Sequence, residues 1–178
     1  YKAIDADPGN WFSNDITVGS NPSAMTLGAD GRLYVANRGG ASVSVIDTNT
    51  FKRIDTDPAN WFSNDIAVGY SPSALALSGS QLYVANRGSN KIHGPAKGKG
   101  SVSVIDFATQ KVDVTWPIPG GGSPDMGNVS ADGRWLWLSA RYDDLAYAID
   151  TTSGEVTSIP VGKEPHGLTV WPQPGRYS

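Results

Sequence analysis

The chain has 178 residues, enough for one sizeable hydrophobic core, and a formal net charge of −3 with acidic and basic residues interspersed. This charge pattern excludes a global field that would recruit nucleic acid or an anionic membrane. The absence of cysteine excludes disulfides and thiolate metal sites, and no apolar run reaches membrane-spanning length. The 21 glycines and 12 prolines are spaced along the chain, which indicates many short strands and tight turns.

An internal repeat organises the chain. The first predicted element contains the phrase DPGNWFSND at residues 7–15, which returns as DPANWFSND at residues 57–65. We expect this phrase to be an insertion between the outermost strand of one unit and the innermost strand of the next. Longer repeats of the type VGSNPSAMTLGADGRLYVANRGGASVSVID follow the two copies and continue beyond them, at residues 18–47, 68–88 with 101–106, 120–150, and from 161 onward.

Each repeat unit is predicted to hold four strands and no helix, because its apolar residues alternate or form short β-branched runs. In order, the strands follow NPSA or SPSA, then LYVAN, then SVSVID, and the outermost is typified by QKVDVTWPI. Asp30-Gly31 and Asp132-Gly133 supply turns between the first two strands. Asp47, Asp106 and Asp150 end the third strand, where a carboxylate can accept hydrogen bonds from the next amides. Four-stranded units at this period are typical of β-propeller blades.

The combination LYVANRG…SVSVID, preceded by VGxxPSA, resembles the YVTN repeat family of β-propellers, which includes YncE-like and surface-layer-type proteins. The resemblance covers most of the chain, although WLWLSARYDD replaces LYVANRG in the third unit. It implies an all-β propeller with four-stranded antiparallel blades. Because about three and a half blades cannot close comfortably, we expect a fragment of a longer, typically seven-bladed protein, or a half that pairs with another copy. The predicted division is an outer strand of a preceding blade at 1–20, blades at 21–70, 71–121 and 122–162, and an inner strand of a following blade at 163–178.

Polar residues recur where each inner strand begins, at the predicted mouth of the central channel. Alignment of the units places Ser23, Ser73, Asp125 and His166 at one equivalent position. Arg38, Arg87 and Arg141 align at the end of the second strand, on the same face because neighbouring strands are antiparallel. These seven residues are the predicted ligand-binding set.

Two interpretations of the repeated arginines remain open. They can offer planar forks to a carboxylate, a phosphate or sugar hydroxyls, or they can bridge neighbouring blades. Asp125 and His166 are specific to single blades, which favours a site. His166 can also be satisfied by a carbonyl, and two side chains do not make a metal site. No metal ligand set and no cofactor are predicted, although missing blades can complete a metal site at the mouth.

Two exposed features are candidate partner contacts. Trp11 and Trp61 in the repeated phrase suit sugar stacking or protein contact, or they cover the blade edge. The segment SNKIHGPAKGKG is either a partner-binding loop or a solvated loop. Its candidate contacts are Lys91, His93, Lys97 and Lys99.

No nucleophile elbow, phosphate-binding glycine loop or H-E-x-x-H motif is present in the sequence. The leading hypothesis is therefore a non-enzymatic, extracytoplasmic binding scaffold for a small molecule, glycan or protein, with no nucleic acid partner. The expected export signal lies outside this chain. The resemblance also implies an alternative, a lactonase-like hydrolase or a metal- or cofactor-dependent oxidoreductase. A third possibility is a purely structural surface-layer-like module.

Overall fold

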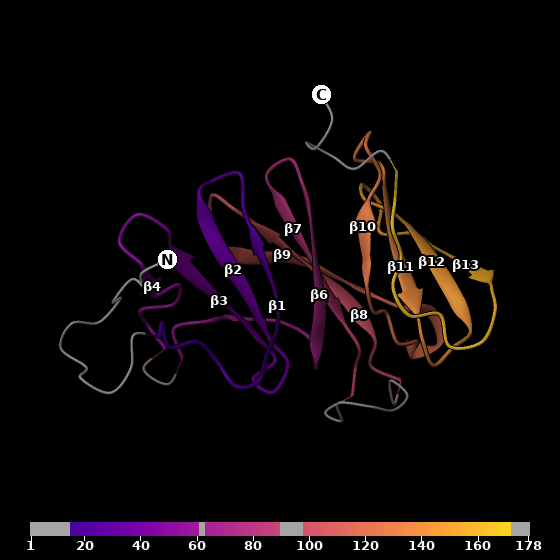
Figure 1. The fold of residues 1–178 in the computed structure, drawn as a ribbon, viewed down its shortest axis with the longest axis horizontal. Coiled ribbons are helices and arrows are strands. Elements are labelled where there is room, and N and C mark those ends of the chain that lie inside the picture. The colour runs from indigo at the N-terminus through magenta and orange to yellow at the C-terminus, as the bar shows by residue number, and fades with distance from the viewer. Residues whose placement is uncertain (1–14, 61–62, 90–97, 172–178) are drawn as a thin grey trace, which may run out of the picture.

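The computed structural model describes residues 15–60, 63–89 and 98–171. Within these ranges the chain forms antiparallel β-sheets arranged one beside another along the molecule (Figure 1). The only helical element in the described chain is the short 3₁₀ segment η1 (Pro119–Gly121). The all-β prediction is therefore confirmed.

The sheets follow one another in chain order, and each is built from consecutive strands. The first blade contains β1 (Pro22–Leu27), β2 (Arg32–Asn37), β3 (Ser42–Asp47), β4 (Lys52–Ile54) and β5 (Ile66–Ala67). The second contains β6 (Pro72–Ser78), β7 (Gln81–Asn86), β8 (Ser101–Asp106) and β9 (Lys111–Pro117). The third contains β10 (Gly127–Val129), β11 (Trp135–Ala140), β12 (Leu145–Asp150) and β13 (Val156–Pro160).

The turns form as the sequence predicts. Gly31 and Gly133 have φ values of 77° and 74°, which a residue without a Cβ adopts at little cost. Asp47 Oδ1 accepts hydrogen bonds from the backbone amides of Asn49 and Thr50 at 2.7 and 3.2 Å. The equivalent Asp106 and Asp150 cap their own turns in the same way, so the predicted role of these three carboxylates is confirmed.

The outer edge of the first blade differs from the sequence-based prediction. The repeated phrase was expected after the outermost strand, but it interrupts that strand. β4 pairs with the second half of β3, opposite Val45 to Asp47, whereas β5 pairs with its first half, opposite Ser42 and Val43. The chain leaves the sheet after Ile54 and returns at Ile66. The physical reason is that β3 carries backbone groups along its whole length, and a second short strand pairs those that β4 does not reach.

A buried carboxylate ends the inserted segment. Asp65 is 8% exposed and accepts hydrogen bonds from the hydroxyls of Ser42 and Ser44 at 2.8 and 2.7 Å. It also accepts from Asn37 Nδ2 at 3.3 Å and pairs with Arg53 Nη2 at 2.7 Å. This Asp65 network joins three strands of the first blade, and its paired charges explain how a carboxylate remains inside the sheet.

Two apolar layers hold the blades together. The layer between the first and second blades is formed by Tyr34, Val43, Val45, Ile66, Leu82, Val84, Ile105 and Phe107. The layer between the second and third blades includes Trp116, Val129, Leu136, Leu138, Tyr147 and Ile149. Burial of each Val, Leu or Ile side chain stabilises the fold by about 1.5–3 kcal/mol. Because both layers draw on two sheets, the core lies between the blades.

The inner strands β1, β6 and β10 lie side by side, with β6 in contact with the other two. On β1, Met25 and Leu27 are 69% and 59% exposed, although the equivalent Leu75 and Leu77 of β6 pack into the layer against the first blade. Within the described residues, this side of the first blade is therefore apolar and uncovered.

The segment after β13 forms no strand in the described residues 161–171. The sequence predicted the innermost strand of a following blade at 163–178. A strand requires a hydrogen-bonded neighbour, and within the described chain this segment pairs with none. Its Glu164 amide instead donates to Asp144 Oδ1 at 2.9 Å.

Candidate functional site

The aligned arginines are fixed by the turns that follow the second strand of each blade. The Arg38 amide donates to the Asn21 carbonyl at 3.0 Å, and the Arg87 amide donates to the Ser71 carbonyl at 3.1 Å. Both acceptors directly precede the proline that opens an inner strand. These bonds hold each arginine beside the start of its inner strand.

Arg38 and Arg87 come from different blades but lie close enough to interact. Burial lowers the pKa of Arg38, and the positive charge of Arg87 lowers it further. The Asp125 carboxylate opposes both effects. Two guanidinium groups and one carboxylate therefore share one region at the same end of the three blades.

Tyr142 joins Arg87 to Arg141. The guanidinium carbon of Arg87 lies 5.1 Å from the centroid of the Tyr142 ring, and that of Arg141 lies 5.7 Å from it. Both distances fall within the range of cation–π attraction. The sequence prediction missed Tyr142. The sequence feature that could have revealed it is the aromatic residue after the aligned arginine of the third unit, where the first two units have Gly39 and Gly88.

Asp125 and His166 also meet, as their alignment predicted. Asp125 is 3% exposed, and its amide donates to the Ser139 carbonyl at 2.7 Å. The His166 Nε2 atom lies 4.0 Å from Asp125 Oδ2, and the imidazole is half exposed. This separation permits an ion pair with a protonated imidazole but is too long for a direct hydrogen bond.

Ser23 and Ser73 are placed differently, because their hydroxyls face main-chain carbonyls. Ser23 Oγ lies 2.8 Å from the Pro72 carbonyl of the second blade. Ser73 Oγ lies 3.5 Å from the Pro124 carbonyl, just before the third blade's inner strand. Each hydroxyl also lies 3.3 Å from a carbonyl of its own blade. The two serines thus connect successive inner strands, and a role in ligand binding stays a prediction.

Buried donors lie next to this region. The Nε atoms of Arg38 and Arg141 are buried and have no hydrogen-bond partner among the described residues. The same holds for the hydroxyls of Ser71 and Ser123, which precede the prolines that open the second and third blades. A buried polar atom without a partner costs about 1–3 kcal/mol. We name Arg38, Arg87, Arg141, Tyr142, Asp125 and His166 the mouth cluster.

Some of the residues predicted to bind a metal or a partner lie within the described ranges, and others lie outside them. No group of three His, Asp or Glu side chains gathers in the part of the chain that the structure describes. Asp125 and His166 alone are fewer than the three protein ligands of a catalytic zinc. Lys99 Nζ lies 5.1 Å from the Tyr70 ring centroid. The other partner candidates, Trp11, Trp61, Lys91, His93 and Lys97, lie outside the described residues.

Three adjacent sheets of antiparallel strands, with their inner strands side by side and polar residues at one end, define a β-propeller. A family model for the YNCE-like β-propeller matches residues 78–174. The chain belongs to this family, and the resemblance found in its sequence is confirmed. No match was found among the curated proteins. The described residues contain no helix that is long and apolar enough to cross a membrane.

Solved structures show the same fold. The hydrazine synthase of Kuenenia stuttgartiensis is 24% identical with a TM-score of 0.65, and the match covers 89% of this chain and 41% of that one. A virginiamycin B lyase from Staphylococcus aureus is 19% identical with a TM-score of 0.63, covering 83% and 45%. A Bacteroides fragilis protein assigned as a 6-phosphogluconolactonase is 19% identical with a TM-score of 0.59, covering 86% and 43%. The chain spans less than half the length of these structures.

Proposed function

We propose that the protein is a non-enzymatic binding propeller that acts outside the cytoplasm and holds a small carboxylate- or phosphate-bearing ligand at the mouth cluster. The observation that carries the proposal is the convergence of Arg38, Arg87 and Arg141 from three blades around Tyr142. Guanidinium groups are planar forks that match the oxygen pairs of carboxylates and phosphates.

The charge balance of the cluster favours an anion. Arg38 interacts with the buried carboxylate of Asp125 and with Arg87. Arg87 and Arg141 both lie over the Tyr142 ring. The mouth cluster thus has three guanidinium groups and one carboxylate, so it is cationic without any contribution from His166. The like charges of Arg38 and Arg87 repel each other, and an anion bound between them relieves this repulsion.

The extracytoplasmic location comes from the resemblance to YVTN-repeat proteins. Further blades of the same protein, or a second copy, would cover the exposed Met25 and Leu27 of β1. A closed propeller would then surround the mouth cluster with the equivalent residues of the remaining blades, and these would set the identity of the ligand.

One observation favours a second candidate, an enzyme. A buried Asp125 beside an exposed His166 resembles the acid–base pairs of catalytic sites. Two of the similar structures carry enzyme names, a lyase and a lactonase. Metal content and intact mass, measured on one sample of purified protein, separate the candidates. Stoichiometric metal favours the enzyme, whereas metal-free protein favours the scaffold.

Calorimetric titration with inorganic phosphate and with acetate tests the anion proposal. We expect saturable binding that Arg38→Gln weakens about tenfold, because a charge-assisted hydrogen bond is lost. Arg134→Gln is the matched control, since Arg134 is exposed in the third blade and pairs with Asp150. Absence of anion binding, or equal loss in both variants, contradicts the proposal.

A further inference from the structure

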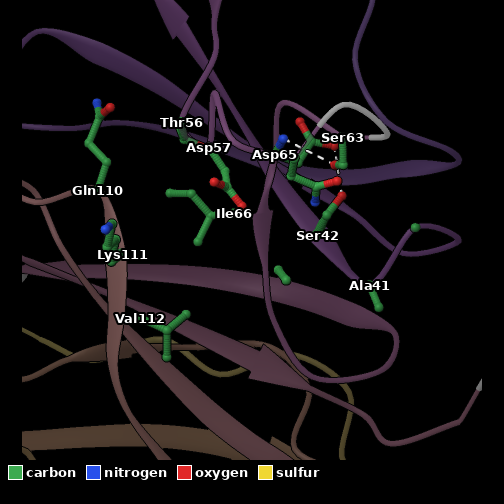
Figure 2. Close-up of a pocket in the computed structure, with 13 residues that line it drawn as sticks. Ala41, Ser42, Thr56, Asp57, Ser63, Asp65, Ile66, Gln110, Lys111 and Val112 are labelled. Carbon is green, nitrogen blue, oxygen red and sulfur yellow. Dashed lines mark hydrogen bonds between the residues drawn. The ribbon is translucent and has the colours of Figure 1, made fainter.

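A second cavity lies at the outer edge of the first two blades, apart from the mouth cluster. Its volume is about 420 Å³, within the usual range for small-molecule sites. The inserted segment supplies one wall and the start of β9 supplies another, as Figure 2 shows. Without the insertion there would be no wall on the first-blade side, so the cavity is a consequence of the interrupted outer strand. We name it the outer-edge pocket.

Most polar groups of the outer-edge pocket already have partners. Ser42 Oγ donates to Asp65, and Asp65 is paired with Arg53. Thr56 Oγ1 donates to the Asn64 carbonyl at 2.9 Å. The Gln110 carboxamide, with its oxygen turned toward Arg32, accepts from Nη1 at 2.9 Å. These groups shape the wall and have little capacity left for a ligand.

Two charged side chains of the lining differ from the rest. The Asp57 carboxylate and the Lys111 ammonium line the same cavity, and among the described residues neither has an ion-pair or side-chain hydrogen-bond partner. In the view of Figure 2 the apolar side chain of Ile66 lies between them, and Val112 lies next to Lys111 on the β9 wall. The pocket therefore presents one negative and one positive group separated by an apolar floor.

This arrangement is complementary to a ligand that carries one positive and one negative group. An ammonium group is complementary to Asp57, a carboxylate is complementary to Lys111, and the short carbon chain between them covers Ile66. A ligand with a single charge would pair with only one of these two side chains and leave the other unpaired. We infer that the outer-edge pocket binds a small zwitterion, an amino acid or a short peptide with free amino and carboxyl termini.

The test uses the full chain and glycine, diglycine and triglycine, whose charges are separated by increasing lengths of backbone. Calorimetry gives the affinity, and the amide resonances of Ser42, Ala67 and Val112 report whether binding occurs in the pocket. We expect saturable binding of one member of the series with shifts at these amides. N-acetylation or C-amidation of that peptide is expected to weaken it about tenfold, since each removes one charged contact.

Matched variants separate a specific charge pair from general electrostatics. Asp57→Asn and Lys111→Gln are each expected to weaken binding about tenfold. Asp113→Asn and Lys163→Gln change the net charge equally at exposed positions outside the pocket and are expected to leave the affinity unchanged. Because Asp57 and Lys111 are exposed, we expect both substitutions to leave the free energy of unfolding nearly unchanged.

Any one of the following results overturns the inference. They are no binding by any of the three peptides, equal binding of the capped peptides, equal loss in the control variants, or shifts confined to residues outside the pocket. Binding of glucose in place of the peptides also overturns it, since a neutral polyol needs neither charge. The inference is independent of anion binding at the mouth cluster, because Arg38 does not line the outer-edge pocket and Arg38→Gln therefore reports only on the mouth cluster.

Discussion

The first and second blades have nearly the same inner strands and different outer edges. Their second strands read RLYVAN and QLYVAN, and their third strands both read SVSVID. In the second blade, β9 runs along the full length of β8, from Pro117 opposite Ser101 to Lys111 opposite Asp106. In the first blade the same edge is divided between β4 and β5. An outer strand can therefore be opened while the rest of the blade is retained, because it has a neighbour on one side only.

The difference places a carboxylate where the second blade has a hydroxyl. Val43 pairs with Ile66 as Val102 pairs with Trp116, so Asp65 occupies the position of Thr115. In the second blade, Asn86 Nδ2 donates to the hydroxyls of Ser101 and Ser103 at 3.2 and 3.0 Å. Ser103 and Thr115 are only loosely bonded, at 3.4 Å. The first blade thus stabilises its polar interior with a charge, and the second does so with neutral groups.

The third blade has no polar network at the equivalent positions. Ala140, Leu145 and Tyr147 stand where the first blade has Asn37, Ser42 and Ser44. Tyr147 reaches out of this region and donates its hydroxyl to Asp143 Oδ2 at 3.1 Å. A blade interior can therefore be polar, as in the first two blades, or apolar, as in the third. In the polar interiors the Nδ2 atoms of Asn37 and Asn86 are hydrogen-bonded, whereas their buried Oδ1 atoms have no partner among the described residues.

Removal of the charge from the first blade should have the largest effect. Asp65→Ala leaves Arg53 and two serine hydroxyls without their acceptor inside the sheet, and we expect a loss of about 3–5 kcal/mol in the free energy of unfolding. Thr115→Ala at the equivalent position should cost less than about 1 kcal/mol, because Thr115 is exposed and its hydrogen bond is long. Urea unfolding of both variants measures the difference.

An isosteric variant refines this comparison. Asp65→Asn keeps the shape and one acceptor oxygen but loses the ion pair with Arg53. It should fall between the two alanine variants, at about 1.5–3 kcal/mol. Equal losses for Asp65→Ala and Thr115→Ala would show that the carboxylate is not what holds the divided edge together.

Deletion of residues 55–64 should give the first blade a continuous outer strand like that of the second blade. Ile54 would then precede Asp65 directly, as Val114 precedes Thr115. Closing a loop of about ten residues costs about 2 kcal/mol of chain entropy, so we expect the shortened protein to fold with equal or higher thermal stability. The same deletion should abolish peptide binding at the outer-edge pocket. A strongly destabilised protein would contradict the equivalence of the two edges.

The smallest expected effect concerns the turn caps, which the blades share. Hydrogen bonds from the Asn49 and Thr50 amides lower the pKa of Asp47, and those from Ser153 and Thr152 lower the pKa of Asp150. Because the folded-state pKa is depressed, the contribution to stability is present above the unfolded-state pKa. It is lost as the pH falls through the folded-state pKa.

Carboxyl-carbon NMR titration of the two aspartates checks this prediction. Both should titrate below the ordinary aspartate pKa of about 3.9. Asp47→Asn should reduce the acid sensitivity of unfolding while the Asp150 titration stays unchanged, since the two turns belong to different blades. A titration of Asp47 at or above the ordinary value would show that the amide bonds do not persist in solution.

Much of the mouth cluster was predictable because it repeats. The proline-started inner strands and the arginine after each second strand recur at fixed spacing, so alignment alone placed Asp125 near His166 and the arginines on one face. Alignment did not reveal the partners of the serine hydroxyls, because the Pro72 and Pro124 carbonyls belong to other units. Tyr142 was missed for a related reason, since it departs from the repeat and its contact with Arg87 crosses between blades.

The all-β class, the strand order, the turn caps and membership of the propeller family could be predicted from the amino-acid sequence. All of these depend on interactions within one unit, which local pattern and period encode directly. Three features are visible only in the folded chain. The repeated phrase interrupts the outer strand, three strands hold Asp65, and Asp57 and Lys111 line one pocket. Those features arise where segments distant in the sequence meet, and a strand pairs with whatever edge the packed sheets leave available.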